Sequence, residues 1–535
     1  MTRTWPLLLL LVGCPSEEAP PPLPTPSPTP EPVAPPSSDP ADWPRPGDAC
    51  GLQTDLDDPH FLEGDRVEFG LQCALGDLDD YELTPILVPD QGFDADRRAV
   101  DWVTDLSDGG RYDLVFGVRP SGDPSAVPVA EVVTFWVADD PSAPGGQPPV
   151  PEEYTEEWGV PVFHIDPQGS VSQTYTSADI TFRGRTYDGA IKVRGASSTA
   201  YDKKSFTVEF NAEELPVEEW GVTRDHLYLV TSFDDNSYVR QKLVYDQWMA
   251  MADYWQSARL TPRTFFAVVY FDGEYHGLYT AIDRPDNEFL DHMGFARDAD
   301  LFKSVNHDAN YYYTRANGSQ KGSLHDGYEK EEGLDGDWSV LDALVDWAAG
   351  SEYQAVVDEA GDWIDLGEWM DWFLLVHYGE GGDSAGKNIY LAYDPATAPE
   401  FHVHPWDFNH VWGQDWRTFR IPSDRQTSFD NRNRVFAAIH ATAADDELWD
   451  RFRAMRADGP YALAWMHGKL DEYYSLIDKS AARDWEKWQD SYYNFGRWSS
   501  NRTSAGDFND YEGEKAYVYG WIQDRDDLFR EVHPD

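Results

Sequence analysis

The chain has 535 residues, of which 41% are hydrophobic and 14% aromatic, including 22 Trp and 29 Tyr. That much apolar surface excludes a largely disordered chain, and the length predicts several domains rather than one. The 97 acidic and 42 basic side chains give a net charge of −55, which repels phosphate backbones and argues against nucleic-acid binding.

The first fourteen residues have the pattern of a bacterial export signal. Arg3 is followed by an apolar run over residues 7–12 and then by Gly13 and Cys14. The run is shorter than the ~18 apolar residues of a membrane-spanning helix, and its order of charge, apolar run, small residue and Cys resembles a lipobox. We therefore expect a lipoprotein of the cell envelope, at the outer membrane or cell surface. Lipid on Cys14 would be its one membrane contact.

A stretch rich in Pro, Ser, Thr and Glu, residues 15–42, predicts an extended linker that buries nothing. Between residues 43 and 140, short alternating runs such as residues 66–69 (RVEF) are separated by Gly, Asp and Pro turns. This pattern predicts a small Ig-like β-sandwich. Cys50 and Cys73 are the remaining cysteines, and in an oxidising compartment we expect them to form a disulfide.

A second Pro- and Gly-rich linker, residues 141–152, precedes one large α+β unit over residues 153–535. The unit is expected to open with strands, to continue with a helix over residues 236–252, and to contain a hairpin that turns at residues 272–273 (DG). A helical region, interrupted by a short pair of strands, follows. This order predicts an atypical two-lobed, protein-kinase-like domain.

Residues suited to phosphoryl transfer lie in the second half of the chain. Such transfer needs a carboxylate near the acceptor hydroxyl, oxygen ligands for Mg²⁺ and a cation on the phosphates. Asp383 precedes Asn388 by five positions, which is the separation between the base and the metal-binding Asn of a kinase catalytic loop. Asp407 follows at the end of a predicted strand. We therefore predict Asp383 as the catalytic base, with Asn388 and Asp407 as ligands of Mg²⁺ or Mn²⁺.

Six short segments add a more specific signal. They are residues 192–198 (KVRGASS), 203–206 (KKSF), 271–279 (FDGEYHGLY), 327–330 (GYEK), 387–391 (KNIYL) and 405–409 (PWDFN). In this order they resemble the signatures of the CotH kinase family, the relatives of spore coat protein H. The resemblance implies an atypical kinase that uses ATP and a divalent metal to phosphorylate Ser or Thr of proteins outside the cytoplasm.

The resemblance also implies where the nucleotide binds. Arg194, Gly195, Ser197 and Ser198 would form the turn that covers the phosphates. Small side chains in such a turn let backbone N–H groups approach phosphate oxygens. We therefore expect this turn to contact ATP.

A lysine is expected to contact the phosphates and to act in catalysis. Lys204 is favoured over Lys203 because alternate strand residues share a face. On that argument Lys204 would point inward together with the apolar residues Phe206, Val208 and Phe210.

Two departures from the family leave a second function open. The family reads Pro-Trp-Asp-x-Asp where this chain has Asn409, which removes one charged oxygen ligand from a metal site. Asp283 stands where members often carry Glu, and the predicted helix over residues 236–252 contains no Glu to pair with the lysine. The alternative is therefore a catalytically weak or inactive adhesion or structural lipoprotein on the same scaffold.

Overall fold

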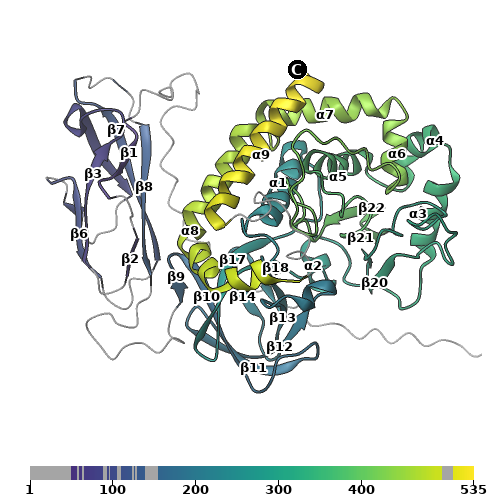
Figure 1. Ribbon diagram of the computed structural model, residues 1–535, viewed down its shortest axis with the longest axis horizontal. Coiled ribbons are helices and arrows are strands. Elements are labelled where there is room, and N and C mark those ends of the chain that lie inside the picture. The colour runs from purple at the N-terminus through teal and green to yellow at the C-terminus, as the bar shows by residue number, and fades with distance from the viewer. Residues whose placement is uncertain are drawn as a thin grey trace, which may run out of the picture. The chain divides into compact units, whose positions relative to one another are not determined.

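The computed structural model describes residues 50–56, 60–62, 66–87, 93–94, 97–104, 110–122, 126, 129–138, 155–496 and 510–534. The predicted export signal with Cys14 and the two predicted linkers lie outside these residues. The described chain forms a β-rich N-terminal part and a larger α+β part (Figure 1). No helix in the described ranges is both long enough and apolar enough to cross a bilayer.

Two four-stranded sheets make up the N-terminal part. The first has the order β1 (Leu52–Thr54), β3 (Arg66–Cys73), β6 (Ala99–Val103), β5 (Phe93–Asp94). The second has the order β2 (His60–Leu62), β8 (Val129–Ala138), β7 (Gly110–Pro120), β4 (Tyr81–Leu87), the last preceded by a 3₁₀ turn, η2 (Leu78–Asp80). The rings of Phe61, Phe69 and Phe135 contact one another. Short strands are thus present as expected, and the Ig-like sandwich stays a prediction.

The two cysteines of this part carry a testable prediction. Cys50 and Cys73 are bonded, with their Cα atoms 5.1 Å apart across a sequence separation of 23. Closing a loop of this length should stabilise the N-terminal part by about 3 kcal/mol in the chain-entropy model. We expect mass spectrometry of non-reduced peptides to find Cys50 linked to Cys73. Two free thiols in the purified protein would contradict the assignment.

The larger part begins with a closed β-barrel. Its strands pair in the order β10 (Val160–Pro167), β11 (Thr176–Phe182), β12 (Arg185–Arg194), β13 (Ser205–Phe210), β16 (His226–Thr231), β18 (Glu274–Asp283) and β17 (Thr264–Phe271). The barrel closes because β17 returns to β10 in parallel, whereas the other neighbours are antiparallel. Strands were expected here, but closure was not, because it depends on pairing between strands remote in sequence.

Three short strands accompany the barrel. β9 (Glu156–Glu157) pairs with β10, and β14 (Leu215–Val217) pairs with β15 (Val222–Arg224) in a separate hairpin.

Strand β17 shows that the barrel wall is buried on both faces. Phe265, Ala267 and Val269 belong to the core inside the barrel. The residues between them belong to a second core, which the wall shares with α1 (Arg240–Trp255) and α8 (Leu463–Asn494). Figure 1 shows α8 lying beside α9 (Tyr511–Val532). Alternation along a strand therefore separates two buried faces, rather than a buried face from a solvated one.

The remaining region combines helices with a small sheet. The sheet has the order β20 (Tyr328–Glu332), β19 (Asp300–Ser304), β21 (Ile389–Asp394), β22 (Ala398–Pro405). The helices are α2 (Asn287–His292), α3 (Ser339–Gly350), α4 (Tyr353–Asp358), the 3₁₀ turn η5 (Ala360–Asp362), α5 (Leu366–Gly379), α6 (Arg434–His440) and α7 (Ala444–Asp458). Helix α5 is buried at every position from Glu368 to Gly379, as expected for a helix inside a core. The α+β class is confirmed.

Candidate functional site

Three residues predicted from the sequence lie together in the structure. The side-chain nitrogen of Asn388 lies 3.3 Å from a carboxylate oxygen of Asp383 and 3.4 Å from the backbone oxygen of Asp407. Asn388 immediately precedes β21 and Asp407 follows β22, and these two strands pair antiparallel. The hairpin therefore brings together two residues that are 19 positions apart.

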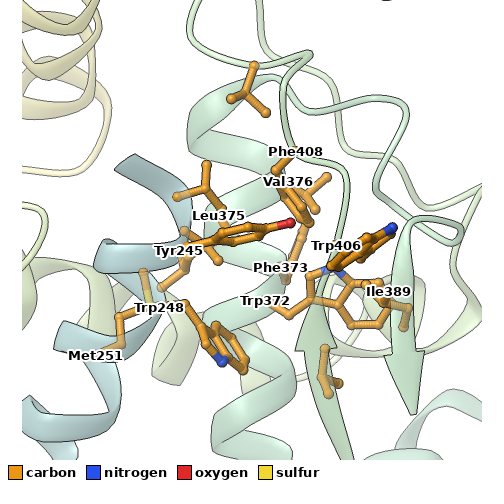
Figure 2. Packing of buried hydrophobic residues seen from close by; sticks show 14 of the residues in the cluster. Tyr245, Trp248, Met251, Trp372, Phe373, Leu375, Val376, Ile389, Trp406 and Phe408 are labelled. Atoms are coloured by element: carbon orange, nitrogen blue, oxygen red, sulfur yellow. The ribbon is translucent and has the colours of Figure 1, made fainter. Parts of the chain in front are cut away.

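Asp407 is exposed to solvent, although the residues on either side of it are buried. Trp406 and Phe408 are buried in the core between α1, α5 and the small sheet (Figure 2), whereas Asp407 itself is exposed. Its φ is 56°, in the left-handed region that Asp tolerates better than most residues. Its backbone N–H donates to the hydroxyl of Tyr245 at 3.1 Å.

The carboxylate of Asp407 is available to a cation. Within the described ranges, no side chain donates a hydrogen bond to it or forms an ion pair with it. Although the residue reaches solvent, the surrounding protein partly desolvates this carboxylate and raises its pKa. The positive charges of His410 and Arg194 oppose the rise, and the carboxylates of Asp234 and Asp383 add to it. A bound cation would relieve this unfavourable charge.

Asp383 lies in the loop after α5 and is surrounded by donors. Lys387 Nζ lies 2.8 Å from one of its oxygens, His307 Nε2 lies 3.4 Å from the other, and His410 Nδ1 is 3.9 Å away. Burial opposes its charge, but His307, His410 and Lys387 together hold the pKa of Asp383 well below its usual range. Asp383 is therefore ionised, and it suits accepting a hydrogen bond from a hydroxyl better than storing a proton.

Asp234, a buried carboxylate that was not predicted from the sequence, contacts the residues beside Asp383. Asp234 lies 3.1 Å from His410 Nε2 and accepts hydrogen bonds of 2.8 Å from both Tyr201 and Asn409. Burial opposes the charge of His410, but Asp234 and Asp383 raise the pKa of His410 to about 10. Asn409 fits because its amide donates to Asp234, whereas an Asp there would face a second carboxylate.

Arg194 ends β12 beside the same site. Its guanidinium carbon lies 4.1 Å from the ring centroid of Tyr228 and 5.4 Å from that of Trp406. Among the residues that the structure describes, no carboxylate forms an ion pair with Arg194. A planar cation held on aromatic rings and left without an acidic partner is suited to bind phosphate.

The turn after Arg194 requires a glycine. Gly195 has a φ of 112°, and a Cβ at this position would lie 2.1 Å from the hydroxyl oxygen of Ser198. The next residues form a 3₁₀ turn, η4 (Ser197–Ala200). The predicted nucleotide-covering turn is therefore tight, as close approach of backbone to phosphate requires.

The strand argument that favoured Lys204 is wrong. Strand β13 starts at Ser205, and the apolar residues that share the parity of Lys204 fill the barrel interior. The ammonium of Lys204 donates to the backbone oxygens of Thr199 (3.0 Å) and Tyr201. It therefore braces the turn, and its assignment as the phosphate contact stays a prediction without support from this geometry.

Lys203 is the buried lysine of the pair. Its Nζ lies 2.7 Å from Asp484 on α8 and donates to the backbone oxygen of Leu278 at 2.6 Å. Gly277 leaves room for this pair, since a Cβ there would lie 2.3 Å from the Asp484 carboxylate. The acidic partner of Lys203 is thus Asp484, which lies on a helix near the end of the chain.

Lys303, on β19, is a further cation that the sequence did not single out. Its ammonium lies 3.9 Å from Glu331 and 5.5 Å from the ring centroid of Tyr390. Burial lowers the pKa of Lys303, and the charge of nearby Arg194 lowers it further. No motif marks this residue, because only the pairing of β19 with β21 brings it to the site.

Comparisons with known proteins match the region that holds this site. The family model described as CotH kinase protein matches residues 191–528. The chain is also 26% identical over 288 residues to the inner spore coat protein H of Bacillus subtilis (strain 168), an alignment that covers 54% of this chain and 76% of that protein. The family match includes Arg194, Asp383, Asn388 and Asp407.

Proposed function

This chain belongs to the CotH kinase protein family, and we propose that it is an atypical kinase that transfers phosphate from ATP to Ser or Thr of proteins outside the cytoplasm. The observation that carries the proposal is the meeting of Asp383, Asn388 and Asp407 in one site beside Arg194. They would supply the carboxylate, the oxygen ligands and the cation that phosphoryl transfer needs.

The donor set fits a hard divalent cation. Asp407 offers an unpaired carboxylate and Asn388 a side-chain amide oxygen, and Mg²⁺ and Mn²⁺ prefer oxygen ligands. A bound Mg²⁺ or Mn²⁺ would offset negative charge on the phosphates. Arg194 and Lys303 would contact the phosphates as well, while the N–H groups of the turn at Gly195 would cover them.

Asp383 would act on the acceptor. Because its carboxylate is ionised, it would accept a hydrogen bond from the Ser or Thr hydroxyl and hold the oxygen in line for attack. Lys387 and His307 fix the orientation of the carboxylate.

We also propose a two-lobed arrangement of the larger part and a lipid attachment at the cell envelope. The barrel, which supplies Arg194, and the helical region, which supplies Asp383 and Asp407, would be the two lobes of a kinase-like fold. Lipid on Cys14 would hold the protein at the cell envelope. The relative named as a spore coat protein supports action outside the cytoplasm.

Metal-dependent nucleotide binding tests the proposal. We expect calorimetry with the full chain to detect ATP binding in Mg²⁺ or Mn²⁺ and none in EDTA. Asp407→Asn should weaken that binding by about tenfold or more, because it removes a formal charge at the ion. Asp335→Asn, which removes an exposed carboxylate from the loop between β20 and α3, should leave it unchanged. A wild-type chain without metal-dependent ATP binding would favour the adhesion or structural function instead.

A further inference from the structure

A cavity of about 240 Å³ opens beside Asp383. Its lining includes His307, Arg417, Arg425 and Arg432, but none of the residues assigned above to the phosphates or the metal. The volume is below the roughly 300–1,000 Å³ of pockets that enclose whole small molecules. The cavity has room instead for one or two side chains of another protein whose chain approaches Asp383 from solvent.

The arginines of this cavity are only partly neutralised. Arg432 donates to the backbone oxygen of Gly382 at 2.8 Å and lies 3.2 Å from His307 Nε2, and none of the described carboxylates pairs with it. Arg425 has a 54% exposed side chain, 3.4 Å from Glu380. Arg417 pairs with Asp415 at 2.9 Å and is 43% exposed. The lining also holds Glu380, Asp383 and Asp415, so its three arginines balance three carboxylates. In a chain of net charge −55, a near-neutral opening in which Arg432 has no acidic partner among the described residues and Arg425 is more than half exposed is a local departure that favours an anionic ligand.

An exposed aromatic residue adjoins these cations. Trp416 lines the cavity and is 54% exposed, with the Arg417 guanidinium carbon 5.4 Å from its ring centroid. Trp and Arg are enriched among the residues that contribute most of the binding energy in protein interfaces.

We propose that this cavity binds the acceptor protein, and that it selects a segment in which Asp or Glu side chains flank the Ser or Thr to be phosphorylated. The inference rests on the proposed kinase function, since it places the acceptor hydroxyl at Asp383. The acidic side chains bind Arg425 and Arg432, and the backbone of the segment passes over Trp416.

Peptide binding without nucleotide tests the inference separately from catalysis. Fluorescence anisotropy with the full chain would compare labelled peptides whose single Ser is flanked by Asp and Glu, by Asn and Gln, or by Lys and Arg. We expect the acidic peptide to bind about tenfold more tightly than the neutral one. Arg432→Gln and Arg425→Gln should each weaken acidic-peptide binding by about two- to fivefold.

A matched control removes an equally exposed arginine elsewhere. Arg297 has a 54% exposed side chain and does not line the cavity, so Arg297→Gln should leave peptide affinity unchanged. Equal affinity for the three peptides, or preference for the basic one, would overturn the inference.

Transfer from radiolabelled ATP to the same peptides separates the two proposals. Acidic-peptide binding that depends on Arg425 and Arg432, with no transfer, supports the acceptor site and contradicts the kinase. Transfer at equal rates to all three peptides supports the kinase and contradicts the acceptor site.

Discussion

Replacing Asp383 by Asn should lower phosphoryl transfer by about 10²- to 10⁴-fold. Asn has almost the same size but lacks the negative charge that accepts a hydrogen bond from the acceptor hydroxyl. It also loses the ion pair with Lys387. Nucleotide binding should stay close to wild type, because the phosphates are assigned to Arg194, Lys303 and the metal. Initial transfer rates at saturating ATP, together with calorimetry of ATP binding, would measure both effects.

Two controls accompany this variant. Asp450→Asn removes a carboxylate that is 71% exposed and pairs with Arg453 on the surface of α7, so transfer should be unchanged. Thermal unfolding should show that Asp383→Asn is folded. A folded Asp383→Asn variant that transfers phosphate within threefold of wild type would remove Asp383 from the site of acceptor binding.

The predicted residues that the structure brings together depend on local structure. Asp383 and Asn388 are five positions apart in one loop, and Asp407 follows after one hairpin, so their meeting needs only β21 and β22 to pair. The helix expected over residues 236–252 is α1, shifted by a few residues to Arg240–Trp255. The predicted turn at residues 272–273 joins β17 to β18. Patterns of this kind are set by neighbours in sequence.

The features that were missed depend on pairing between distant segments. Barrel closure requires β10 to meet β17, and Asp234 reaches the Asp383 loop through His410. No spacing rule links such residues, because only the tertiary fold brings them together. The expected direction of the Lys204 side chain was wrong for a related reason. Strand parity shows which residues share a face, but here both faces of the wall are buried, so parity alone cannot say which face meets the site.

The pairing of Lys203 with Asp484 predicts the largest loss of stability. Lys203→Met should destabilise the larger part of the chain by about 3–5 kcal/mol, because it leaves the Asp484 carboxylate buried without a counter-charge. The side chains of Lys203 and Asp484 are 1% and 3% exposed, so water cannot replace the lost partner. Lys204→Met should cost much less, since it removes only hydrogen bonds to backbone oxygens at a partly exposed turn. Urea unfolding followed by tryptophan fluorescence would measure the change in unfolding free energy.

A double variant separates the buried charge from lost packing. In Lys203→Met with Asp484→Asn, the charge at position 484 is absent, and the Asn oxygen can still accept from the backbone N–H of Leu278, which now donates to Asp484 at 2.7 Å. The double variant should therefore be more stable than Lys203→Met alone, and the coupling between the two substitutions should exceed about 1 kcal/mol. The ion pair does not hold α8 to the barrel if the two changes in unfolding free energy are additive. The same conclusion follows if Lys203→Met is as stable as Lys204→Met. The barrel would then be held to α8 by the apolar contacts of its outer face and by the remaining hydrogen bonds, such as that from Trp488 to the backbone oxygen of His276.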